Sequence, residues 1–102
     1  MHLIRLLLPL YDNDGNRFPA KLLDDVFDEL THKFGGITAY QRSPAEGAWK
    51  PPGERVVHDD VVLFEVMVDP LDRAWWADYR RKLEERFQQD KLLILALAVE
   101  AV

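Results

Sequence analysis

The chain has 102 residues, of which 48% are hydrophobic and 30% are charged, as is usual for one soluble globular domain. The absence of cysteine excludes disulfides and thiolate chemistry, and the formal net charge of −5 argues against a nucleic-acid partner. The apolar opening is too short for a signal peptide, and no stretch approaches the ~20 apolar residues of a membrane span. We therefore expect no membrane partner and a cytoplasmic location.

Hydrophobic periodicity predicts six secondary-structure elements. In chain order these are a strand at 2–8, a helix at 19–34, strands at 36–42 and 57–68, a helix at 70–88 and a strand at 91–100. This βαββαβ order is the split-βαβ pattern. It predicts an α+β fold in which residues 1–102 form a single domain, with a four-stranded antiparallel sheet and both helices on one face.

The first helix has clear ends. Pro19 suits the first turn, where its missing N–H is not needed, and Gly35 and Gly36 can end the helix because glycine adopts a left-handed conformation cheaply. The apolar residues recur every four positions and predict one buried face: Leu22, Val26, Leu30 and Phe34.

The second helix is indicated as strongly. Asp69 is the expected cap and Pro70 the expected first residue, and an aromatic and apolar face runs from Leu71 to Phe87. Its remaining surface is basic, whereas that of the first helix is acidic. We expect the two helices to lie side by side with complementary charges, although a docking surface for a partner is the alternative.

The strand patterns predict a sheet that is covered on both faces. In the 57–68 strand one alternating set is purely apolar and is expected to pack under the helices: Val62, Phe64, Val66 and Val68. The last strand is apolar on both sides, and no helix remains to cover the second face. We expect a homodimer through this open sheet face, unless the segment 43–56 folds back over it.

The segment 43–56 is a long loop, well beyond the length usual for a hairpin. It carries one large aromatic residue, Trp49, among prolines and glycines. Trp49 is expected either to anchor the loop or to line a pocket.

The order of elements and the run GGITAYQRSPAEGAWK, Gly35–Lys50, resemble small uncharacterised bacterial proteins of ferredoxin-like fold. The pattern looks more loosely like the dimeric α+β barrel group, which includes cofactor-free monooxygenases and small isomerases. The resemblance implies a homodimer with a cavity between sheet and helices or beneath the loop, and no cofactor. It carries no catalytic signature onto this chain.

Six residues are candidates for ligand binding: Thr38, Tyr40, Arg42, Trp49, His58 and Glu65. Glu65 lies among apolar neighbours, so its charged form is disfavoured unless Arg42 or Arg5 pairs with it. The group is therefore either an ion pair that fixes the dimer register or a ligand-binding patch. His58 and Asp60 could share a strand face, but two ligands rarely suffice for a metal, and no metal site is expected.

Two classes of function remain. The first is a non-enzymatic homodimeric module that binds a small molecule or a protein. The alternative is a cofactor-independent monooxygenase or isomerase, in which Trp49 and Tyr40 shape a pocket and His58 or Glu65 moves a proton. The thin inventory of polar residues favours the binding module.

Overall fold

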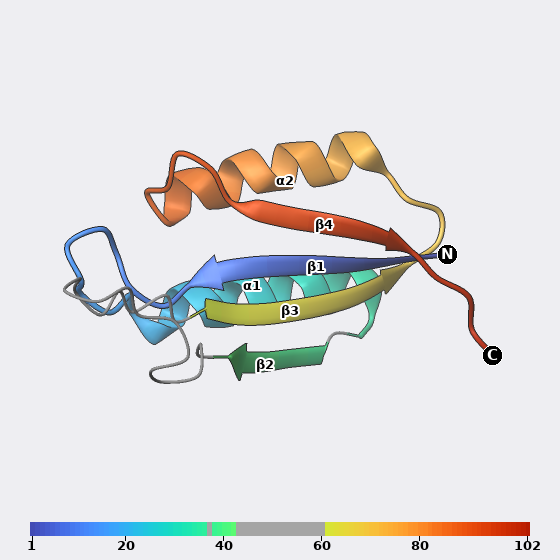
Figure 1. Cartoon of the computed structure of the whole chain (residues 1–102), viewed down its shortest axis with the longest axis horizontal. Coiled ribbons are helices and arrows are strands. Elements are labelled where there is room, and N and C mark those ends of the chain that lie inside the picture. Colours follow the sequence, from blue (N-terminus) through green and yellow to red (C-terminus); the bar gives the residue numbers. More distant parts are fainter. Residues whose placement is uncertain (37, 43–60) are drawn as a thin grey trace, which may run out of the picture.

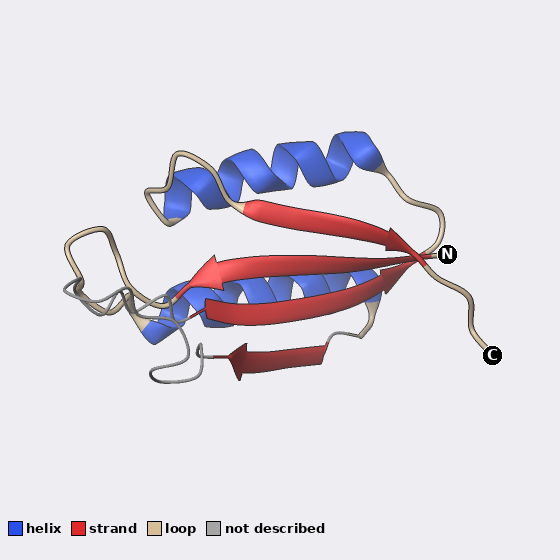
Figure 2. Ribbon diagram, in the orientation of Figure 1, coloured by secondary structure: helices blue, strands red, loops and turns tan. Residues whose placement is uncertain are grey.

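The computed structural model describes residues 1–36, 38–42 and 61–102, with the backbone alone for 38–42. The elements are β1 (His2–Pro9), α1 (Ala20–Phe34), β2 (Thr38–Arg42), β3 (Val61–Val68), α2 (Arg73–Arg86) and β4 (Leu93–Ala98) (Figure 1). The strands lie in the order β2-β3-β1-β4, and each neighbouring pair is antiparallel. The predicted α+β class, with two helices and an antiparallel sheet, is confirmed (Figure 2).

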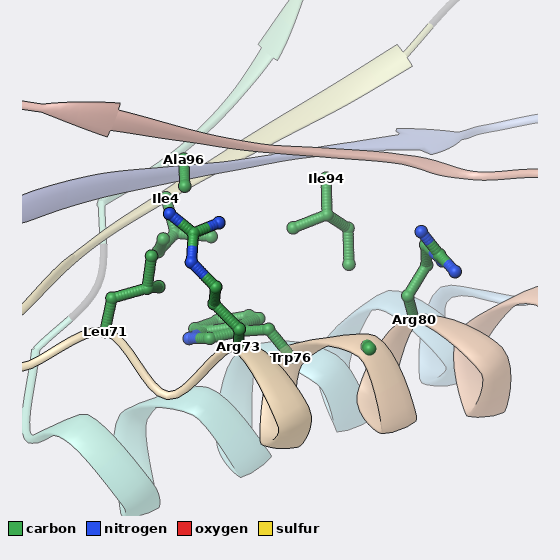
Figure 3. Close-up of a pocket in the computed structure, with 8 residues that line it drawn as sticks. Ile4, Leu71, Arg73, Trp76, Arg80, Ile94 and Ala96 are labelled. Carbon is green, nitrogen blue, oxygen red and sulfur yellow. The ribbon is translucent and has the colours of Figure 1, made fainter.

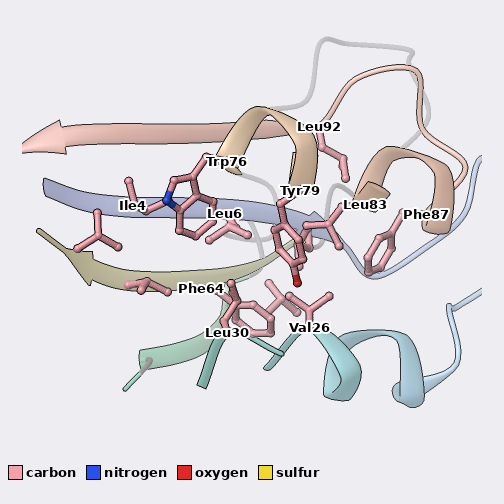
Figure 4. Close-up of a cluster of buried hydrophobic side chains, with 14 of the residues drawn as sticks. Ile4, Leu6, Val26, Leu30, Phe64, Trp76, Tyr79, Leu83, Phe87 and Leu92 are labelled. Carbon is pink, nitrogen blue, oxygen red and sulfur yellow. The ribbon is translucent and has the colours of Figure 1, made fainter. Parts of the chain in front are cut away.

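The core lies between the helices and one face of the sheet (Figure 4). Alternate residues of β1 point into it, and the apolar set of β3 packs there as predicted. From the helices, Val26 and Leu30 of α1 meet Trp76, Tyr79 and Leu83 of α2. Burying one such aliphatic side chain fully contributes about 1.5–3 kcal/mol. Both helices are therefore held by the same apolar layer.

The end of α1 is formed as predicted. Gly35 adopts a left-handed conformation with φ of 79°, and its N–H donates to the Thr31 carbonyl at 2.8 Å. Pro19 precedes the first turn and gives no side-chain cap. The helix therefore depends on its buried face and on its glycine C-cap rather than on an N-terminal cap.

The start of α2 differs from the prediction. The N-cap is Asp72 rather than Asp69, because the Asp72 side chain accepts the Trp75 backbone N–H at 3.1 Å. The helix consequently begins at Arg73. Either aspartate could cap a helix by its chemistry, and Leu71, which lies between them, packs against the core ahead of the helix.

The last strand also begins later than predicted. The Leu92 N–H donates to the Glu84 side chain at 2.9 Å, so this backbone group bonds to α2. Leu92 itself is buried in the core, and β4 starts at Leu93. The link fixes the end of β4 that lies nearest to the C-terminal part of α2.

Candidate functional site

Among the predicted site residues, Glu65 has a described environment. It lies directly opposite Arg5 in the β1–β3 register, and Arg5 Nε donates to Glu65 Oε2 at 3.0 Å. The Glu65 side chain is 17% exposed. The predicted pairing of Glu65 is therefore made with Arg5 of the neighbouring strand.

The remaining predicted residues are placed only in part. The β2–β3 register sets Thr38 opposite Glu65, Tyr40 opposite Leu63 and Arg42 opposite Val61. Trp49 and His58 lie outside the described residues, as does the whole 43–56 loop. The register thus brings the backbone of Thr38 next to the Arg5–Glu65 pair.

A pocket opens between α2 and β4, at the edge of the sheet (Figure 3). We call it the α2–β4 pocket. Its volume is about 190 Å³, and its lining comes from β1, β4 and the segment 71–80. The lining residues are Ile4, Leu71, Arg73, Trp76, Ala77, Arg80, Ile94 and Ala96.

The pocket is lined by six apolar residues and two arginines, and polar atoms make up slightly more of its open surface than apolar atoms do. Trp76 and Ile94 point into it, and the side chains of Arg73 and Arg80 rise from α2 toward β4 on either side of Ile94 (Figure 3). Ile94 is half-buried and Ala96 is exposed, because α2 leaves this part of β4 open. The arrangement suits a small ligand with an apolar body.

The two arginines differ in their surroundings. Within the described residues, the Arg80 Nε is buried without a hydrogen-bond acceptor, and it lies 3.9 Å from Glu84 Oε1. Arg73 is exposed and makes no ion pair with any residue in the described ranges. Both guanidinium groups therefore retain hydrogen-bonding capacity.

The resemblance implies a cavity between sheet and helices, but none of the residues that line this pocket is among the six candidates, because the lining is assembled from segments far apart in the chain. One local indication is available: Arg73 and Arg80 are seven residues apart, which places them on one side of a helix. Both belong to the basic surface of the second helix, which the sequence predicts to complement the acidic first helix.

A second polar cluster joins the two helices. Arg86 donates to both oxygens of Glu29, at 2.7 and 2.8 Å, and Tyr79 Oη donates to Glu29 Oε1 at 2.8 Å. The bonds from Arg86 hold the pKa of Glu29 below its usual value, against the effect of burial. The Arg86–Glu29 ion pair provides charge complementarity between α1 and α2, as expected from the sequence.

Within the described part of the chain, no group of three or more potential metal-ligating side chains gathers. The helices found there are also not long and apolar enough to cross a membrane.

No family model and no curated protein sequence matches this chain. Among solved structures, the chain is similar to a phage SAM lyase in complex with S-methyl-5′-thioadenosine, with a TM-score of 0.56. The sequences are 11% identical, and the match covers 94% of this chain and 79% of the lyase chain. At that identity the similarity concerns the fold alone.

Proposed function

We propose that this protein is a homodimeric module of ferredoxin-like βαββαβ fold that binds a small molecule in the α2–β4 pocket. The observation that carries the proposal is the pocket itself, a recess of mixed polarity with Trp76 in its wall and two arginines at its sides. Ligand sites are typically such recesses, with a few polar groups that orient the ligand.

The size of the pocket sets the size of the ligand. Its volume is about 190 Å³, whereas an engineered protein cavity of about 150 Å³ holds benzene. A single ring with one substituent fits this volume. A larger molecule would extend through the open side toward solvent.

The described residues favour binding over catalysis. An enzyme of the cofactor-independent monooxygenase or isomerase kind needs a group that moves a proton at the cavity. The side chains that line the pocket include no carboxylate or histidine, and arginine stays protonated. Glu65 is engaged with Arg5 on the sheet.

Ligand titrations followed by two-dimensional NMR of the ¹⁵N-labelled protein test this function. The probes are benzoate, benzamide and S-methyl-5′-thioadenosine, the last because it occupies the structurally similar lyase. We expect at least one probe to shift the Trp76 indole N–H and the backbone signals of Ala77 and Ile94.

Two matched alanine variants locate the binding. Ala96→Phe fills the pocket from β4, whereas Ala98→Phe adds the same ring two residues further along the same strand face, outside the lining. Binding should be lost in the first variant and kept in the second. If no probe shifts these signals, or if Ala96→Phe binds as well as the parent chain, this function is wrong.

The homodimer is supported by the second face of the sheet. Three large apolar side chains are exposed there, Met67 at 52%, Leu93 at 48% and Leu95 at 40%. They surround the Arg5–Glu65 pair, whose charges already compensate each other. A second copy of the chain would bury these side chains and would offer the same apolar side chains in return.

Sedimentation equilibrium tests the dimer. We expect twice the mass of the chain for the parent protein and the mass of one chain for Leu95→Lys, which places a charge on this face. Phe27→Lys is the control, because Phe27 is similarly exposed, at 39%, but lies on α1. A parent protein that stays monomeric at millimolar concentration contradicts the proposal.

A further inference from the structure

We infer that the α2–β4 pocket is selective for a small monocarboxylic acid with a flat apolar body, whose carboxylate is held by Arg73 and Arg80. This inference rests on the proposed function, since it names the chemical class of the ligand for the same pocket.

Arg80 gives the first argument. Its Nε is buried without an acceptor, and the 3.9 Å to Glu84 Oε1 is too long for a hydrogen bond. Glu84 is also held in place, because its Oε2 accepts the Leu92 N–H at 2.9 Å. A buried donor without a partner is unfavourable. The Arg80 side chain as a whole is 42% exposed, so it can turn to offer this N–H to a ligand oxygen at the pocket wall.

Arg73 gives the second argument. It is the first residue of α2, where the helix dipole is positive and a cation is disfavoured. The first turn of α2 holds no acidic residue, and within the described residues Arg73 forms no ion pair. Helix stability therefore does not explain this residue, whereas an anion in the pocket would.

The charge around the pocket favours a single negative charge on the ligand. The two guanidinium groups are balanced in part by Glu84, the one carboxylate that forms an ion pair with either of them within the described residues. One net positive charge remains among these three groups. The planar fork of arginine matches the planar carboxylate and holds it in one orientation.

The apolar part of the ligand is defined by the interior. Ile94 is half-buried and points into the space between the arginines (Figure 3), whereas Trp76 at 6% exposed and Ile4 at 1% exposed form the floor and offer only a small surface. A flat ring placed here would contact Trp76 and leave its carboxylate at the level of the guanidinium groups. Benzoate is the simplest molecule of this class, and benzamide is its neutral counterpart of nearly the same shape.

The experiment compares the dissociation constants of benzoate and benzamide by the same NMR titration. We expect benzoate to bind about tenfold more tightly, because hydrogen bonds to a charged acceptor are stronger than those to a neutral one. Arg80→Gln should remove this preference, and Arg73→Gln should reduce it.

Arg81→Gln is the matched control. Arg81 lies on the same helix, contacts Asp78 at 3.5 Å and is not part of the pocket lining. It should keep the full preference for benzoate. Far-UV circular dichroism of each variant establishes that the fold is retained.

The outcomes separate the two proposals. If benzamide binds in the pocket as tightly as benzoate, the pocket binds ligands and the inference of a carboxylate is overturned. The same conclusion follows if Arg81→Gln weakens benzoate as much as Arg80→Gln does, because the effect is then one of overall charge. If no probe binds, the proposed function itself fails.

Discussion

Arg86 and Glu29 form a bidentate ion pair that joins the last turn of α2 to the middle of α1. The Tyr79 hydroxyl donates to the same carboxylate, so Glu29 accepts three hydrogen bonds from one neighbouring helix. Two parallel bonds between a guanidinium and a carboxylate fix the relative orientation of the groups as well as their distance. The pair therefore sets how the two helices lie over the shared core.

Glu29→Gln should reduce stability in a pH-dependent manner. The Arg86 bonds lower the pKa of Glu29, so its contribution is present above the pKa of the unfolded chain and is lost as pH falls through the folded value. Because both side chains are about a third exposed, solvent screening limits the cost to about 0.5–1 kcal/mol.

Urea unfolding of both proteins at about pH 7 and about pH 3 measures this difference. The gap between parent and variant should shrink at the lower pH. Asp25→Asn serves for comparison, because it removes the exposed Lys21–Asp25 pair within α1 and should cost less. An equal gap at both pH values would show that the Glu29 carboxylate is not the source.

Tyr79→Phe should cost about 1 kcal/mol, the usual net contribution of one hydrogen bond. The ring remains and keeps its stacking on Trp75, with centroids 4.9 Å apart. Burial, and then the bond to Glu29, raise the pKa of the Tyr79 hydroxyl well above its usual value. Stability from this bond is thus lost as pH rises past the ordinary tyrosine pKa.

Alkaline titration of tyrosine absorbance checks the assignment. The chain has three tyrosines, and one should ionise late or only on unfolding. Tyr79→Phe should lack that late step. A late step that persists in the variant would assign it to another tyrosine.

The elements of the fold could be predicted from the sequence because their signals are local. The four-residue recurrence in α1 and the alternation in β3 reflect which side chains face one core, and Val26, Leu30, Phe64 and Val66 are all buried as expected. The start of β4 could not be predicted, because it depends on Glu84 of α2 accepting a backbone N–H from Leu92. That contact exists only once the helix has docked.

The candidate site shows the same limit. Pairing of Glu65 with an arginine followed from its apolar surroundings, but the choice of Arg5 required the register of β1 against β3. The α2–β4 pocket depends on how far α2 stands from the edge strand, and no sequence pattern encodes that spacing. The local indication of the pocket in the sequence is the pair of arginines on α2, which begins at Arg73.

Reversing the charges of Arg5 and Glu65, which face each other on β1 and β3, should reveal the free energy of coupling between them. Arg5→Glu places two carboxylates opposite each other and should be destabilising, because like charges on facing strand positions repel. Adding Glu65→Arg should recover about 0.5–1 kcal/mol relative to the sum of the single changes. Urea unfolding of the four proteins gives this coupling free energy, and a value of zero would mean that the pair makes no net contribution.

Two adjacent glycines offer a test of the end of α1. Gly35 has φ of 79°, whereas Gly36 has no positive φ, and a Cβ at either position would meet no atom of the described residues within 4 Å. Gly35→Ala should therefore cost about 1 kcal/mol from the left-handed backbone alone. Gly36→Ala should be neutral or stabilise by up to about 1 kcal/mol, because alanine restricts the unfolded chain.

Thermal and urea unfolding of the two variants measure this contrast, in which packing plays no part as far as the described residues go, because neither methyl group has a neighbour among them. Gly35→Asn sharpens the test, since asparagine tolerates the left-handed region better than alanine and should recover part of the loss. Equal effects of alanine at positions 35 and 36 would mean that α1 ends without the left-handed turn. In that case the chain would leave the helix in another direction.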